Sequence, residues 1–441
     1  MYFFNRDENE LPDDVPAMLT DKDGNKQVTS YWFGKTAHSW QASLDQYYSL
    51  LQQTGSVGMI TVNYSYARYG TSADPVAAAA HLAADWVRYD NGRTRYWEIG
   101  NENFGDWEAG YRIDLSQNKD GQPEFLTGEL YGKHFGVFAD SMRQAAAGIG
   151  KTIFIGATVY ESEPQNWQTN TVKTWNSSLL PALKDKQDFY VVHNYFTPYN
   201  ENSTSSAVLS AAETVPAKMM SYVKAQIQQY GATVKPIAMT EWNMFATGSM
   251  QQVSNTSGLF GLIVLGESLY NHLGMAARWD LVNGWENGND HGLFSAGDEP
   301  GIAKWSPRPS YYYLYLFRQM MGDRIVPVSV SGQSGIKAYA STYSSGEANA
   351  TLVNTTEKDM VVSVQGKNFN PGARFYYYVL QGDKDNGNFS RKVLVNGQGP
   401  DGVAGGPANI AAIKPRSANT YNNIKIKVPA LGAVMMVIDK K

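Results

Sequence analysis

The stretch Arg95-Tyr-Trp-Glu-Ile-Gly-Asn-Glu-Asn-Phe-Gly105 indicates a buried strand that ends in a cluster of polar residues. Trp97 and Ile99 have the size and the two-residue spacing of side chains in the core face of a strand. The glycine after them lets the backbone approach a neighbour closely. Asn101 and Glu102 follow directly, so the sequence predicts an amide and a carboxylate at the end of this strand.

A second stretch, Pro236-Ile-Ala-Met-Thr-Glu-Trp-Asn243, has the same design. A short apolar strand again ends in a carboxylate, Glu241, with an indole and an amide beside it. Two glutamates at the carboxyl ends of parallel strands are what hydrolysis of a glycosidic bond requires, because one carboxyl group acts as acid and the other as nucleophile or base.

Composition narrows the classes of protein that remain. The chain has 441 residues, enough for a barrel-sized domain and a smaller one, and its formal net charge of −4 gives no basic surface for nucleic acid. No stretch reaches the roughly 18 to 20 apolar residues of a membrane span. There is no cysteine, which excludes disulfides and thiolate zinc sites, and the six histidines are scattered. We therefore expect no metal, no cofactor, no nucleic acid and no membrane as partners.

The order of the predicted elements indicates an α/β fold. Helical patterns separate near-continuously apolar strands, which is typical of a parallel sheet covered on both faces. Polar residues at the strand ends favour a (β/α)8 TIM barrel. Only six strands are evident, near residues 58, 97, 153, 190, 237 and 276. Residues 1–39 resemble a long loop, so we expect the barrel to lack its first two strands in this chain.

The pattern changes at about residue 325. Short strands with alternating apolar residues follow one another, separated by turns rich in glycine, asparagine, aspartate and serine. This pattern is typical of an antiparallel β-sandwich. We therefore place a catalytic barrel domain at residues 1–322 and a β-sandwich domain at residues 323–441.

The two glutamates receive different roles. Glu102 is the candidate general acid/base, because burial beside Trp97 or Trp107 would keep its proton near neutral pH. Glu241 is the candidate nucleophile, ionised and fixed by hydrogen bonds. Asn101 is placed to bond a sugar 2-hydroxyl group. Glu98 faces away from Trp97 and is expected to pair with a helix.

Further candidates for substrate binding lie at other strand ends. His193 and Tyr195 are two residues apart and share one face of their strand. We expect Tyr195 to donate a hydrogen bond to Glu241, and His193 to orient the acid or bind a hydroxyl group, with a buried core histidine as the alternative. The other candidate sugar contacts are Asn63, Trp242, Trp279 and Trp285. For each tryptophan, core packing stays open as the alternative.

Three of these strand ends resemble a known group of enzymes. Trp97-Glu-Ile-Gly-Asn-Glu102 is similar to the acid/base signature of clan A glycoside hydrolases. Thr240-Glu-Trp-Asn243 resembles the nucleophile strand of family 51 α-L-arabinofuranosidases and their relatives in families 39, 30 and 79, and His193-Asn-Tyr195 resembles the sixth-strand motif of that group. The resemblance covers residues 57–320. It implies a retaining double displacement through a glycosyl-enzyme intermediate, without metal. The arginine and the glycine-rich turn that such enzymes bring from the second strand are not found here.

Several alternatives stay open. The long loops Phe104–Phe125 and Thr197–Thr214 would suit an endo-acting glucanase, xylanase or agarase as well as an arabinofuranosidase. A non-catalytic carbohydrate-binding protein would share the aromatic residues but would need no paired glutamates. The expected partner is a plant or algal polysaccharide or oligosaccharide. By analogy with such enzymes we expect a secreted or periplasmic protein, and a homo-oligomer stays open.

Overall fold

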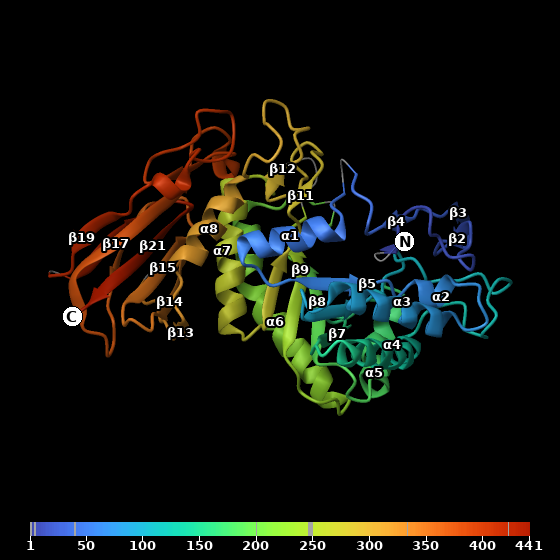
Figure 1. The fold of residues 1–441 in the computed structure, drawn as a ribbon. Helices are drawn as coiled ribbons and strands as arrows, with labels where there is room; N and C mark the ends of the chain where they lie inside the picture. The colour runs from blue at the N-terminus through green and yellow to red at the C-terminus, as the bar shows by residue number, and fades with distance from the viewer. Residues whose placement is uncertain are drawn as a thin grey trace. The chain divides into compact units, whose positions relative to one another are not determined.

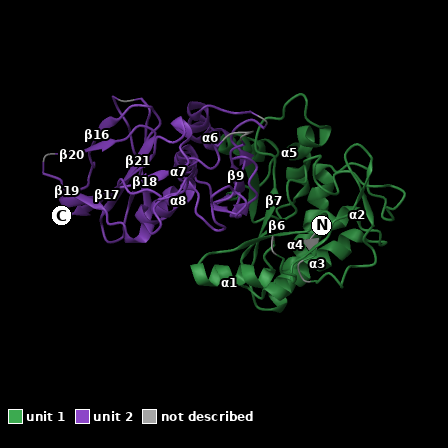
Figure 2. Cartoon of the chain, turned by 90° about the horizontal axis from the view of Figure 1, so that it is seen from above, with its two compact units in different colours: residues 1–193, 219–239 green, residues 194–218, 240–441 purple. Residues whose placement is uncertain are grey.

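The computed structural model describes residues 2–3, 6–38, 41–199, 201–245, 250–332, 334–421 and 423–441 (Figure 1). The chain divides into two compact units (Figure 2). Residues 1–193 and 219–239 form the first unit, and residues 194–218 and 240–441 form the second. This division differs from the predicted domain boundary at residue 322, which stays a prediction.

Six strands form the central sheet. Their order across the sheet is β10-β9-β8-β7-β6-β5. Their bounds are Met59–Val62 for β5, Tyr96–Ile99 for β6, Phe154–Thr158 for β7, Phe189–Tyr195 for β8, Ile237–Asn243 for β9 and Met275–Arg278 for β10. Strands β5 to β8 pair in parallel. The six strands are those that the sequence predicts, and the fold is mixed α/β with a half-barrel rather than a closed barrel of eight strands.

The strands are apolar because both faces of the sheet are covered. Trp97 in β6, Ile155 in β7 and Tyr190 in β8 have no exposed surface. Strands β8 and β9 begin in the first unit and end in the second, so the catalytic candidates at their ends belong to the second unit, apart from His193.

Five helices lie in the first unit over the residues that the structure describes, and a sixth enters it. They are α1 (Leu44–Thr54), α2 (Tyr66–Tyr69), α3 (Pro75–Asp90), α4 (Gly128–Gly148) and α5 (Asn170–Ala182), and α6 (Ser205–Gln229) continues into this unit from the second. Asp74 accepts a hydrogen bond from the Ala77 amide at the start of α3, with Pro75 at the first helical position, and Asn91 ends it at φ +52°. Helices α3, α4 and α5 follow one another beside the strands in Figure 1.

Within the described part of residues 1–39, no strand joins the central sheet. Strand β1 (Tyr2–Phe3) pairs with β4 (Trp32–Phe33), and β2 (Met18–Thr20) pairs with β3 (Lys26–Val28), each as a separate two-stranded sheet. Over the residues that the structure covers, no helix is both long and apolar enough to cross a bilayer.

The carboxyl-terminal region of the second unit is rich in sheet (orange to red in Figure 1). The main sheet has the order β13-β14-β15-β21-β17-β18, with β19 paired to β17, and β16 pairs with β20 separately. The bounds are Arg324–Val326 for β13, Ile336–Thr342 for β14, Ala348–Asn354 for β15, Met360–Val364 for β16, Pro371–Gly382 for β17, Val393–Val395 for β18, Arg416–Asn419 for β19, Ile424–Val428 for β20 and Gly432–Lys440 for β21. Side chains of the β16–β20 pair share one apolar core with the main sheet, including Ile426, Leu352 and Met436.

Two helices of the second unit pack on this sheet. They are α7 (Asn255–Tyr270) and α8 (Pro309–Met320). The Tyr339 hydroxyl of β14 donates to Glu267 of α7 at 3.0 Å, and the Asn255 amide donates to the Leu431 carbonyl at 2.9 Å. Between β10 and α8 the chain forms a long excursion that carries the short strands β11 (Val282–Asn283) and β12 (Phe294–Ser295).

Candidate active site

Glu102 follows β6 in an unusual backbone conformation. Gly100 has φ +75° and Glu102 has φ +40°, in the left-handed region that residues other than glycine seldom occupy. The Glu102 side chain is 17% exposed, and the Trp107 indole Nε1–H donates to its Oε2 at 2.9 Å. Such strained conformations cluster at functional sites. Sequence reasoning named Trp107 only as a source of burial, whereas its ring is 62% exposed and its nitrogen bonds the carboxyl group.

His193 lies between two carboxyl groups of the first unit. Its Nδ1 is 2.8 Å from Oε1 of Glu102, and its Nε2 is 3.8 Å from Oε1 of Glu98. Glu98 is 2% exposed and also accepts from the hydroxyl groups of Thr61 and Thr158, each at 3.4 Å. These contacts join Glu98 to β5, β7 and β8 of the central sheet, and its pairing with a helix stays a prediction.

Glu241 and Tyr195 meet in the second unit. The Tyr195 hydroxyl donates a hydrogen bond to Oε1 of Glu241. The Tyr195 ring stacks on Phe245, with centroids 4.3 Å apart, and lies 5.3 Å from the His291 ring. A hydrogen bond donated to a carboxylate favours its ionised form. This contact therefore suits a glutamate that must act as a nucleophile.

The amide of Asn243 joins β9 to the segment after β10. Asn243 is buried, and its Nδ2 donates to the carbonyl groups of Trp279 at 2.5 Å and His291 at 3.3 Å. Trp279 is 44% exposed and can offer a free ring face to a sugar.

Trp242 is 1% exposed and lies 5.9 Å from the Phe260 ring of α7, so it packs in the core and offers no free face. The pleat explains this correction, because Trp242 points to the opposite face from Glu241.

A buried acid follows Trp279. Burial raises the pKa of Asp280 to about 7; the Arg278 guanidinium opposes this shift, whereas the negative charges of Asp290 and Glu241 add to it. Its Oδ1 is buried and has no hydrogen-bond partner among the described residues. Burial also lowers the pKa of Arg278 to about 10. Sequence reasoning did not select either residue, although both stand at the end of a predicted strand.

Two other candidates, Asn101 and Asn63, have local partners. The Asn101 amide donates to Oε1 of Glu108 at 2.9 Å. Asn63 accepts from the amide of Tyr66 and donates to the Tyr69 hydroxyl, both at 3.2 Å. These side chains thus shape the backbone after β6 and β5, and their contact with a sugar stays a prediction.

Trp285 has cationic neighbours within the second unit. The guanidinium carbons of Arg308 and Arg391 each lie 5.4 Å from the centroid of its ring. This is the range of a cation–π interaction. The ring therefore belongs to a charged cluster, and its role as a sugar platform stays a prediction.

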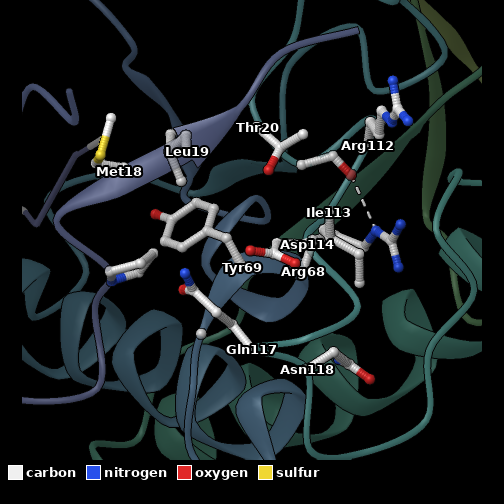
Figure 3. A pocket seen from close by; sticks show the side chains of 13 residues that line it. Met18, Leu19, Thr20, Arg68, Tyr69, Arg112, Ile113, Asp114, Gln117 and Asn118 are labelled. Atoms are coloured by element: carbon white, nitrogen blue, oxygen red, sulfur yellow. Dashed lines mark hydrogen bonds between the residues drawn. The ribbon is translucent and has the colours of Figure 1, made fainter. Parts of the chain in front are cut away.

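A pocket in the first unit lies away from the predicted residues (Figure 3). It is lined by parts of β2, by Arg68 and Tyr69, and by residues 110–118. Arg68 is 1% exposed and donates to the carbonyl of Gly110 at 2.9 Å and to Gln122 at 2.7 Å. Because its donors are used internally, Arg68 stabilises these loops rather than binding a ligand.

Comparison with known proteins places this geometry in context. No family model matches the chain. Heparanase-like protein 1 of Arabidopsis thaliana is 25% identical over 282 residues, which are 61% of this chain, and the chain spans 44% of that relative. The α-L-arabinofuranosidase of Thermotoga maritima, solved with arabinose, superposes with a TM-score of 0.62 at 16% identity, covering 90% of this chain and 80% of that one.

Two further solved structures have other specificities. A 4-O-α-L-rhamnosyl-β-D-glucuronidase of Fusarium oxysporum gives a TM-score of 0.59 at 15% identity, covering 91% of this chain and 82% of that one. A family 44 xyloglucanase of Paenibacillus polymyxa gives 0.57 at 13% identity, with 90% and 83% covered. The resemblance inferred from three strand-end motifs is therefore matched by the fold, and the chain has the fold of these glycoside hydrolases.

Proposed function

We propose that the protein is a retaining glycoside hydrolase that resembles α-L-arabinofuranosidases, with Glu102 as general acid/base and Glu241 as nucleophile. The observation that carries the proposal is the pair of contacts made by one strand. His193 of β8 contacts the Glu102 carboxyl group, and Tyr195, two residues later, donates to Glu241. Each glutamate thus has a ring partner suited to the role proposed for it.

Each oxygen of the Glu102 carboxyl group has a ring nitrogen within hydrogen-bond distance. We assign the imidazole proton of His193 to Nε2, the nitrogen on the side of the Glu98 carboxyl group. Nδ1 is then an acceptor, 2.8 Å from Oε1 of Glu102. In the acid form that the mechanism requires, Glu102 donates to this nitrogen, while Trp107 donates to the other oxygen. The negative charge of Glu98, 3.8 Å from Nε2, favours this tautomer of His193.

The reaction follows from these roles. Glu241 attacks the anomeric carbon while Glu102 gives its proton to the glycosidic oxygen, which leaves with the aglycone. Glu102, now a carboxylate, removes a proton from water as that water attacks the glycosyl-enzyme ester. The product keeps the anomeric configuration of the substrate.

The test is hydrolysis of 4-nitrophenyl α-L-arabinofuranoside, followed by NMR to read the configuration of the first product. We expect retention of configuration, and a loss of at least about 10³-fold in kcat for Glu241→Ala, because the covalent intermediate cannot form. Added azide should restore turnover of Glu241→Ala as the inverted glycosyl azide, and of Glu102→Ala as the retained one. Glu357→Gln, at an exposed glutamate of the second unit between β15 and β16, is the matched control. An inverted product, or full activity of Glu241→Ala, would contradict the proposed roles.

A second candidate, an endo-acting glycanase, is favoured by exposed tryptophans on loops of the first unit. Trp107 follows β6 and is 62% exposed, and Trp167 follows β7 and is 83% exposed. Exposed indoles are uncommon and suit the apolar faces of sugar rings. If the substrate is an extended glycan, internal cleavage of arabinan, xylan or glucan should lower viscosity before much reducing sugar appears. Release of monosaccharide alone would favour the exo-acting enzyme, and binding of these glycans without any hydrolysis would favour a carbohydrate-binding protein.

A further inference from the structure

Four charged side chains form a buried cluster in the second unit. Arg308 at the start of α8 is 3% exposed and contacts the carboxylates of Asp290 and Glu299, which are buried as well. Glu299 also contacts Arg391, which belongs to the carboxyl-terminal sheet region between β17 and β18. We call these residues, Asp290, Glu299, Arg308 and Arg391, the Arg308 cluster.

The Arg308 cluster holds two guanidinium groups and two carboxyl groups, and burial raises the pKa of one of these carboxyl groups, Asp290, to about 7. Removing such groups from water is costly, and buried ion pairs often add little net stability compared with apolar packing. Their best-supported use is to fix one arrangement of chain segments among several that would pack equally well. We therefore expect the Arg308 cluster to fix the conformation of one of the segments that it joins.

Arg391 is itself held firmly by its own region. Its amide donates to Oδ2 of Asp385 at 3.0 Å, and its carbonyl accepts from the amide of Gly405 at 2.9 Å. Its guanidinium group contacts Glu299 and lies over the Trp285 ring, two residues that precede the carboxyl-terminal sheet region in the chain. The Trp285 amide is held in turn by Oδ2 of Asp298 at 2.8 Å.

The segment that the cluster reaches is residues 279–299, which we call the Trp279 segment. It begins with the half-exposed Trp279, whose carbonyl accepts from Asn243, the residue two positions after Glu241. Next to Asp290, the His291 carbonyl accepts from Arg278 at 2.7 Å, and the His291 ring lies beside Tyr195. Within this segment, Trp279 thus contacts Asn243 and His291 lies beside Tyr195, the partner of the proposed nucleophile, whereas Glu299 is tied to the carboxyl-terminal sheet region.

We infer that Arg391 and Glu299 are positioning residues for substrate binding: through them, the carboxyl-terminal sheet region holds the Trp279 segment in the conformation that presents Trp279 to the sugar. This inference rests on the proposed function for its substrate. The contact between Arg391 and Glu299, which we call the brace, is a property of the free protein. It gives the carboxyl-terminal region a part in sugar recognition, although none of its own residues needs to touch the sugar.

The test compares Arg391→Gln with Arg391→Lys and with Arg374→Gln, an exposed arginine of β17 outside the cluster. With 4-nitrophenyl α-L-arabinofuranoside, we expect KM to rise five- to tenfold in Arg391→Gln while kcat stays within threefold, and Arg391→Lys to recover most of the loss. A structural role alone would lower the amount of folded enzyme, and hence the maximal rate, at unchanged KM. Arg374→Gln should match the wild type.

Hydrogen exchange of the free protein provides a readout that needs no substrate. Residues 279–299 should lose protection in Arg391→Gln and in Glu299→Gln, while the central strands keep theirs. If the wild type hydrolyses no glycoside, the proposed function fails, yet this measurement still decides on the brace. Unchanged protection of residues 279–299 in both variants, or an unchanged KM in an active enzyme, would overturn the inference. If Arg391→Gln does not fold, Glu299→Gln and Arg391→Lys carry the test.

Discussion

Replacement of Gly100 by alanine tests the strand end that presents Glu102. Gly100 has φ +75°, which costs a residue with a side chain about 1–2 kcal/mol. An alanine Cβ would also press on Oδ1 of Asn103 and lie 2.7 Å from Cβ of Tyr64. Both neighbours are buried, so the backbone must shift, at about 1–3 kcal/mol for overpacking. We expect Gly100→Ala to destabilise the first unit by about 2–5 kcal/mol in total.

Gly121 offers a matched control. It has the same φ, +75°, but a Cβ at that position would meet no atom within 4 Å. Gly121→Ala should therefore show only the backbone cost, about 1–2 kcal/mol. The assay is thermal unfolding of both variants, where a unit of this size loses about 2–4 °C per kcal/mol, together with the rate of glycoside hydrolysis. If Gly100→Ala were as stable and as active as Gly121→Ala, the strand end would not be the tight support of Glu102 that we describe.

Three further predictions concern single side chains. Tyr195→Phe removes the hydroxyl that donates to Glu241. Because a hydrogen bond to a charged group contributes about 1.5–3 kcal/mol, kcat/KM should fall about 10- to 100-fold, and equally for substrates with good and poor leaving groups. A loss confined to poor leaving groups would argue against a nucleophile at Glu241. Trp107→Phe keeps an aromatic ring but loses the N–H group that donates to Glu102. The fall in kcat/KM should be confined to substrates with poor leaving groups, because these need protonation by the acid. An equal fall for 2,4-dinitrophenyl glycosides would contradict the role of Glu102. Burial lowers the pKa of His134 from 6.5 to about 4, so the unfolded chain binds a proton more readily between these values, and the free energy of unfolding should fall by up to about 3 kcal/mol as pH drops through this window. Melting temperatures at pH 4.5 and 7 should show a smaller difference in His134→Gln, whereas the exposed His81→Gln should behave as the wild type.

Local patterns were sufficient to predict the central strands and the polar residues at their ends. The apolar runs around Trp97 and Tyr190 are long enough to identify buried strands. The polar motifs at the strand ends identify Glu102 and Glu241 as the candidate catalytic residues. The pleat also decides which neighbour of a glutamate is buried, and applying it to β9 would have placed Trp242 in the core.

Contacts between distant segments could not be predicted in this way. Arg391 lies about a hundred residues after Trp285 in the chain, and nothing in either neighbourhood indicates that they meet. The excursion between β10 and α8 has little regular structure, so periodicity gives no information about its path. The partner of Trp107 was missed for a similar reason, because the ring returns to Glu102 through an irregular loop.

The spacing of the two rings on β8 has a consequence for how such sequences can diverge. Side chains of a strand alternate between its faces, so His193 and Tyr195 share a face only while one residue separates them. Deletion of Asn194, or insertion of one residue beside it, would turn one ring away from its glutamate, and no single substitution elsewhere in the strand would restore it. Length changes should therefore accumulate in the loops of homologues and be absent from this interval, which makes His-x-Tyr a more reliable marker for aligning distant members than the residues around it.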